Sequence, residues 1–208
     1  MRELYKSMLQ YDKKLLFILL CLLTFLVLLA KKTLIIYDIA AFEVLEQKGE
    51  MGVFRLLDGL QYFGIPFMYL FKFTVIAFVI WIGCFMFGYK VTYPQLWRVT
   101  LISEFVFLIP EIIKFGWFFF FEGDPSYFDF RAFYPLSILQ LFDYTSLHDK
   151  WLYPLKALNV FEGLYWIALV VGVHYSAKKR KNIAYYIVFS SYVLMFALWL
   201  LYWVSIYK

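Results

Sequence analysis

The sequence predicts an all-α fold, a polytopic membrane bundle of about five transmembrane helices in a single domain, 1–208. Of its 208 residues, 64% are hydrophobic and only 17% are charged, whereas soluble domains average about 45–50% apolar and about 25% charged residues. The basic residues lie beside the apolar runs, as topology signals do. These observations exclude a water-exposed globular domain.

Five segments approach the roughly 17–25 apolar residues that a membrane-spanning helix requires. The predicted spans are 15–37, 65–89, 95–115, 155–175 and 183–206. Pro66 and Pro94 are expected in the first turns of the second and third spans, where proline is tolerated. A signal peptide is the alternative for the first run, but no small-residue cleavage site follows it, which favours an uncleaved anchor.

The distribution of lysine and arginine predicts a cytoplasmic N-terminus and an outside C-terminus. The inner segments would be 1–14, 90–98 and 178–182, and their density of basic residues exceeds that of the long outer loops. Positive charge in short loops orients helices towards the cytoplasm. We expect a bacterial inner-membrane protein with this orientation, although the lysines at 31–32 favour the opposite one.

The outer loops are apolar enough to have structure of their own. The segments 38–47 and 53–63 place apolar residues at helical intervals, which is typical of helices in the membrane interface or of helices that pack across the bundle mouth. The segment 116–154 contains apolar runs that are too short to cross the membrane. Irregular backbone at membrane depth must be buried in protein or line a water-filled cavity. We therefore expect a re-entrant or interfacial hairpin that caps the helices.

The best functional signal is a set of polar residues within the predicted spans, since such groups face the bundle interior or water. This candidate intramembrane network comprises Lys72, Glu104, Glu111, Asn159 and Glu162. Lys72 is expected to pair with Glu111 or Glu162, at matching depth, and Glu104 to remain a neutral acid. The alternative is that these contacts only fasten helices together. Pro110 is expected to kink the third helix.

No motif indicates catalysis or a cofactor. The two cysteines, Cys21 and Cys84, lie in apolar runs, and His148 and His174 fall on opposite sides of the predicted membrane. Catalytic and metal-binding patterns such as H-E-x-x-H are absent from the sequence. The serines at 103 and 190–191 are expected to be intrahelical hydroxyls. We expect no enzyme activity, cofactor or nucleic-acid partner, with a lipid-modifying enzyme as a minor alternative.

The fourth predicted span carries a family resemblance. The run Leu158-Asn159-Val160-Phe161 precedes Trp166, a glycine lies near the end of the span, and a basic turn at 178–181 precedes the last apolar run. This pattern over 153–208 resembles the bacterial branch of the Ypt-interacting-protein (YIP) family. The resemblance implies a non-enzymatic protein with five spans and a cytoplasmic N-terminus. Eukaryotic members bind Rab GTPases, but their Tyr-Gly-Pro motif is absent here, so GTPase binding is not implied.

Two functions fit these expectations. The first is a non-enzymatic scaffold or accessory subunit that contacts the lipid bilayer and docks a membrane-protein partner or another copy of itself through its aromatic surface. The second is a small transporter or channel component that uses Glu104, Glu111 and Lys72.

Overall fold

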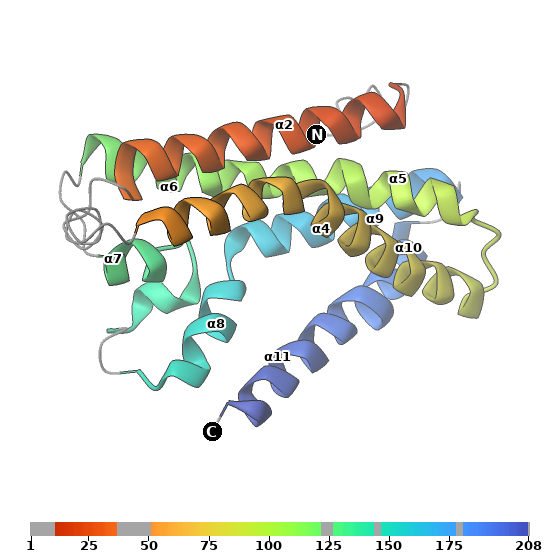
Figure 1. Cartoon of the computed structure of the whole chain (residues 1–208). Coiled ribbons are helices and arrows are strands. Elements are labelled where there is room, and N and C mark those ends of the chain that lie inside the picture. The colour runs from red at the N-terminus through yellow and green to blue at the C-terminus, as the bar shows by residue number, and fades with distance from the viewer. Residues whose placement is uncertain (1–10, 37–50, 122–126, 144–146, 178–180, 208) are drawn as a thin grey trace.

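The computed structural model describes residues 11–36, 51–121, 127–143, 147–177 and 181–207, and these form an all-α bundle (Figure 1). The α-helices are α2 (Lys13–Lys31), α4 (Met51–Met86), α5 (Tyr93–Glu104), α6 (Leu108–Phe120), α7 (Tyr127–Ala132), α8 (Asp149–Ala157), α9 (Val160–Ala177), α10 (Lys181–Val188) and α11 (Leu194–Ile206). Beta structure in these residues is limited to one bridge between Ser137 and Asn159. The predicted fold class is confirmed.

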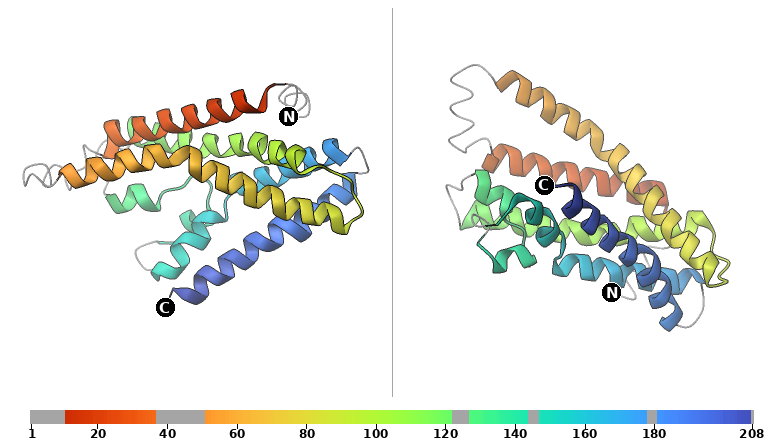
Figure 2. Two further views of the ribbon diagram at one scale, coloured as in Figure 1. Left: turned by 45° about the vertical axis from the view of Figure 1, so that its right-hand side comes forward. Right: turned by 90° about the horizontal axis from the view of Figure 1, so that it is seen from below.

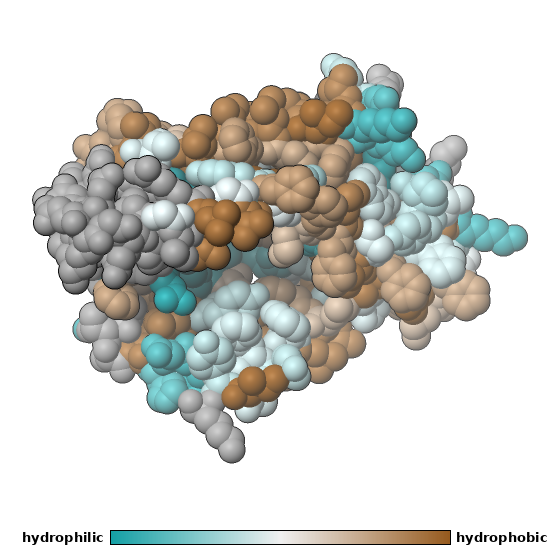
Figure 3. Space-filling view, in the orientation of Figure 1, coloured by the Kyte–Doolittle hydropathy of each residue, from teal (hydrophilic) through white to brown (hydrophobic). Residues whose placement is uncertain are grey.

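The described helices make five passes that alternate in direction (Figures 1 and 2). One end of the bundle, here called the cap end, holds the end of α2, the start of α4, α7, α8 and the C-terminus. The opposite end, the turn end, holds the α4–α5 and α9–α10 connections. Apolar colour covers the side of α2 in Figure 3, with hydrophilic side chains gathered towards both ends.

Among the residues that the structure describes, four helical segments are long and apolar enough to cross a membrane. They are Lys13–Ile36, Gly59–Met86, Val160–Ala177 and Asn182–Ile206. The first of them continues α2 through a π-helical turn, Lys32–Ile36. These four segments correspond to the first, second, fourth and fifth predicted spans.

The third pass is interrupted, and for this reason it contains no helix as long as the candidate spans in the other four passes. It consists of α5, a 3₁₀ turn at Phe105–Phe107 and α6, so neither α-helix exceeds 13 residues. Proline lacks a backbone N–H and its ring clashes with the carbonyl four residues earlier, which for Pro110 is the carbonyl of Val106, inside the 3₁₀ turn. The expected disturbance near Pro110 is confirmed, and α5 to α6 includes the whole of 95–115.

The second pass corrects two expectations. Helix α4 is continuous from Met51 to Met86, so 53–63 extends the spanning helix and is not a separate interfacial helix. Pro66 consequently lies inside the helix and not in its first turn. At about 1.5 Å per residue, its 36 residues reach well beyond a hydrocarbon core of about 30 Å. The helix bends part-way along (Figure 2), as a proline within a helix favours.

The fourth predicted span straddles a helix boundary. Helix α8 ends at Ala157 and α9 begins at Val160, because the Asn159 side chain caps the new helix. Its Oδ1 accepts a hydrogen bond from Glu162 N at 2.8 Å, which satisfies one of the free N–H groups at a helix start. The first part of the predicted span therefore belongs to α8.

The last pass agrees with its prediction and joins α10 to α11 through a π-helical turn, Phe189–Val193. Ser191 Oγ donates to Ile187 O at 2.6 Å, and Ser103 Oγ in α5 donates to Val99 O at 2.9 Å. Both hydroxyls are intrahelical, as expected.

The described residues of the segment 116–154 form a cap over one end of the bundle. Helix α6 extends to Phe120, and α7, a 3₁₀ turn at Ile138–Leu141 and α8 follow within the described residues. Phe118 of α6, Phe130 of α7 and Ile35 after α2 form a buried cluster. The expected capping position is confirmed. The predicted helix at 38–47 lies outside the described residues.

Packing is unequal along the bundle. The largest buried cluster lies towards the turn end, where Ala77 and Ile80 of α4 meet Val99 of α5 and Leu169 of α9. Gly83 of α4 allows a close helix approach there, because a Cβ at this position would lie 3.0 Å from Ser191 Cβ. Towards the cap the buried cluster of described residues is smaller, and there α2, α4 and the α5–α6 pass surround a cavity.

Candidate functional site

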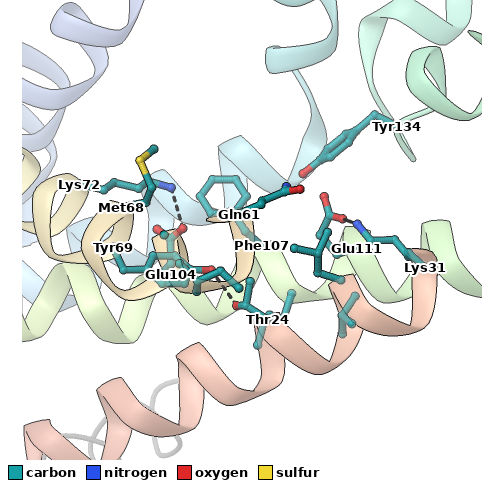
Figure 4. A pocket seen from close by; sticks show the side chains of 15 residues that line it. Thr24, Lys31, Gln61, Met68, Tyr69, Lys72, Glu104, Phe107, Glu111 and Tyr134 are labelled. Carbon is teal, nitrogen blue, oxygen red and sulfur yellow. Dashed lines mark hydrogen bonds and ion pairs between the residues drawn. The ribbon is translucent and has the colours of Figure 1, made fainter. Parts of the chain in front are cut away.

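A cavity of about 500 Å³ lies between α2, α4 and the α5–α6 pass, in the half of the bundle towards the cap (Figure 4). Its size falls within the roughly 300–1,000 Å³ of typical ligand sites. The wall is mainly apolar, with polar groups contributed by Thr24, Lys31, Gln61, Tyr69, Lys72, Glu104, Glu111 and Tyr134. Three of these residues, Lys72, Glu104 and Glu111, belong to the predicted network.

The deeper polar contact joins α4 to α5. Lys72 Nζ lies 2.6 Å from Glu104 Oε1, and the ammonium also lies 4.7 Å from the centre of the Phe107 ring. Glu104 is only 3% exposed, and no described group bonds to its Oε2. The Lys72 side chain keeps 39% of its surface exposed. The expectation that Lys72 pairs with Glu111 or Glu162 was wrong, because its partner is Glu104.

The ion-pair partner of Glu111 lies on the first pass. It forms an ion pair with Lys31, the last residue of α2, and the next residue, Lys32, donates to Gln61 Oε1 of α4 at 2.5 Å. Sequence reasoning treated the two lysines as topology signals and missed these contacts. Their position at the outer end of the first span, close to the depth assigned to Glu111, was the available signal.

Neutral polar groups complete the lining. Thr24 of α2 and Tyr69 of α4 share a hydrogen bond of 2.8 Å. Tyr134 approaches from the cap side (Figure 4), and burial raises the pKa of its phenol above the usual value, with a smaller contribution from Glu111. The phenol is therefore uncharged at neutral pH and can donate a hydrogen bond.

The loop that carries Tyr134 is fixed to the start of α9. Val160 N donates to Leu136 O at 3.2 Å, and Ile138 N donates to Leu158 O at 3.0 Å. Leu136 itself has a positive φ of 56°, an unfavourable conformation for a residue with a side chain that surrounding contacts must maintain. These backbone bonds hold the loop beside the cavity.

The other two members of the predicted network lie in a separate cluster on α9. Glu162 is buried, and its Oε1 accepts hydrogen bonds from Trp166 Nε1 at 2.8 Å and from Tyr192 OH at 3.0 Å. Asn159 caps the same helix. Neither Asn159 nor Glu162 lines the cavity. The network therefore divides into a cavity group and a contact that joins α9 to the last pass.

Removing the Tyr192 hydroxyl tests the strength of this second contact. Polar contacts between membrane helices contribute about 0.6 kcal/mol on average and at most about 1.7 kcal/mol. We expect Tyr192→Phe to lower the free energy of unfolding by about 1 kcal/mol, measured by reversible unfolding in mixed micelles. Tyr202→Phe on exposed α11 is the control, with an expected change below about 0.5 kcal/mol. Equal effects of the two substitutions would contradict this interpretation.

The geometry of the cavity favours binding of a charged or strongly polar group. Each lysine and each glutamate is compensated by its neighbour, so the buried charges are balanced. A ligand with charges of its own can take the place of either partner. No family model, curated protein or solved structure matches the chain.

Proposed function

We infer that the protein is a small, non-enzymatic integral membrane protein that acts as a transporter component and binds its solute in the cavity. One observation carries this proposal: Lys31 with Glu111 and Lys72 with Glu104 line the same cavity. Ionisable groups within membrane spans are costly to insert, face the bundle interior or water, and mark solute and ion pathways. A protein that needed them only to fasten helices would have no use for the space between them.

The membrane arrangement that we propose has five crossings, with α5 and α6 together forming the third. Four segments of the described chain meet the length and composition needed for a span, and the α5–α6 pass lies alongside them in the bundle (Figure 1). The density of lysine and arginine in the inner segments supports a cytoplasmic N-terminus in a bacterial inner membrane. The cavity then lies in the outer half of the bilayer.

A scaffold or accessory role has less support. It was argued from the extensive aromatic and apolar surface, and many such side chains of α4 and α11 are exposed. Contact with lipid requires the same surface, so the exposed side chains do not distinguish a docking face from a membrane-facing one.

Accessibility of the cavity to water and to both membrane faces tests the proposal. Ile65 of α4 lines the cavity, whereas Phe67, two residues further, is exposed on the outer wall about 200° away around the helix. In a background of Cys21→Ala and Cys84→Ala, we expect Ile65→Cys to react with a charged, membrane-impermeant thiosulfonate. Phe67→Cys, the matched control, is expected to remain unmodified because thiolates form in water and not in lipid.

A transporter exposes its site to each side of the membrane in turn. Ile65→Cys in oriented proteoliposomes should therefore react when the reagent is applied to either face, as detected by the mass of the labelled protein. Labelling from one face only would indicate a fixed binding site and contradict transport. Absence of labelling at Ile65→Cys would contradict a hydrated cavity.

A further inference from the structure

The cavity is electrically balanced, and this restricts which solutes it accepts. Its lining holds two lysines and two glutamates, arranged as two neighbouring pairs. A ligand with a single charge would release one partner of a pair and leave that partner uncompensated in a poorly solvated site, which is strongly unfavourable. A ligand with one charge of each sign can replace both contacts of a pair and keep every charge compensated.

The Lys72–Glu104 pair is the more open of the two to such an exchange. Glu104 Oε2 is buried without a bonding partner among the described residues, so the carboxylate has unused acceptor capacity. Lys72 offers further N–H groups, and part of its side chain surface is exposed. Figure 4 shows the two groups side by side at one end of the cavity.

We propose that the cavity binds a zwitterion that carries a primary ammonium beside an acidic group. The ammonium binds Glu104 and the acidic group binds Lys72, in exchange for the direct contact between the two side chains. This inference rests on the proposed function, because it names the class of solute that the cavity takes.

The unused oxygen of Glu104 also specifies the kind of cation. A primary ammonium has three N–H donors and can satisfy Oε2 while it balances the charge. A trimethylammonium group carries positive charge without any N–H donor and would leave that oxygen unsatisfied. The cavity should therefore prefer an ethanolamine-type head group to a choline-type one.

The position of the cavity mouth indicates where such a ligand enters. Among the lining residues, Met68 and Gln61 of α4 are exposed, and both lie within the candidate span Gly59–Met86. Residues such as Val27, Leu28 and Ile65 make the wall apolar. A phospholipid with an ethanolamine head group fits this setting, and free glycerophosphoethanolamine, a phosphodiester with one negative charge beside its ammonium, shares the same head-group chemistry.

The test is a comparison of lipids retained by the whole protein. Nanodiscs are prepared with equal amounts of phosphatidylethanolamine, phosphatidylcholine and phosphatidylglycerol with identical acyl chains, and bound lipids are counted by native mass spectrometry. We expect phosphatidylethanolamine to be retained about tenfold above either competitor, as one charge-assisted hydrogen bond implies. The variant Lys72→Met/Glu104→Gln should lose this preference. Glu162→Gln, outside the cavity, should keep it.

A second experiment distinguishes the two sources of the ligand, which are a phospholipid and a free head group. Free glycerophosphoethanolamine at millimolar concentration should displace the retained lipid if the head group alone binds, and should leave it in place if the acyl chains contribute; either result supports the zwitterion. Equal retention of phosphatidylcholine, an excess of phosphatidylglycerol, or an unchanged preference in the double variant would overturn the proposal.

The comparison among lipids uses the wild-type protein, so the proposal can fail even if the double variant does not fold. The zwitterion proposal and the proposed transporter function can also be contradicted independently of each other. Labelling of Ile65→Cys from both faces without any preference for phosphatidylethanolamine would leave a transporter with a different solute.

Discussion

Lys72→Met is expected to destabilise the protein by about 3 kcal/mol. Removing one partner of a buried ion pair leaves an uncompensated charge, which costs about 3–5 kcal/mol, and the partial exposure of the Lys72 side chain places the effect at the lower end. Glu104 is almost fully buried and would lose the only described group that bonds to its carboxylate. The free energy of unfolding in mixed micelles measures this loss.

The double variant Lys72→Met/Glu104→Gln provides the decisive comparison. It removes both charges at nearly constant volume, so we expect its stability to lie within about 1 kcal/mol of the wild type. Lys90→Met, in the exposed α4–α5 turn, controls for the loss of one positive charge and should change stability by less than about 0.5 kcal/mol. A double variant as unstable as Lys72→Met would show that the lysine acts through packing and not through Glu104.

Lys114→Met is expected to release the cap from the bundle. Lys114 of α6 is buried, and its Nζ donates to Phe130 O and, at 3.0 Å, to Phe133 O, at the end of α7. Each buried carbonyl left without a donor costs about 1–3 kcal/mol. Because these bonds tie α7 to α6, the loss should appear first as local opening. Hydrogen–deuterium exchange of peptides covering 127–137 should accelerate by about tenfold or more.

Two further substitutions control this result. Lys156 of α8 donates to Arg131 O at 2.7 Å, so Lys156→Met should accelerate exchange in the same peptides to a smaller extent. Lys150→Met removes a positive charge from the start of α8 at the same end of the bundle and should leave exchange of 127–137 unchanged. Unchanged exchange in Lys114→Met would show that aromatic packing around Phe118 and Phe130 holds the cap without the lysine.

The sequence by itself determined the fold class and most of the membrane-spanning segments. Long uncharged runs can be buried only in lipid or against each other, and this constraint acts locally along the chain. The same reasoning located Lys72, Glu104 and Glu111, because a charge within an apolar run must be shielded from lipid, but it missed Lys31 at the end of the first run. The boundaries were less accurate at α4 and α8, where continuation through Pro66 and the cap formed by Asn159 depend on neighbouring contacts.

Only the tertiary structure decided which charges meet. The sequence predicted Lys72 at the depth of Glu111 and Glu162, whereas it meets Glu104, and neither the rotation of each helix nor the order of the helices around the bundle was readable. Those two quantities place Glu104 against Lys72 and Glu111 against Lys31, and turn Glu162 towards Trp166 and Tyr192. The cavity has the same origin, because it forms where three passes diverge towards the cap and no large side chain of the described residues fills the space between them.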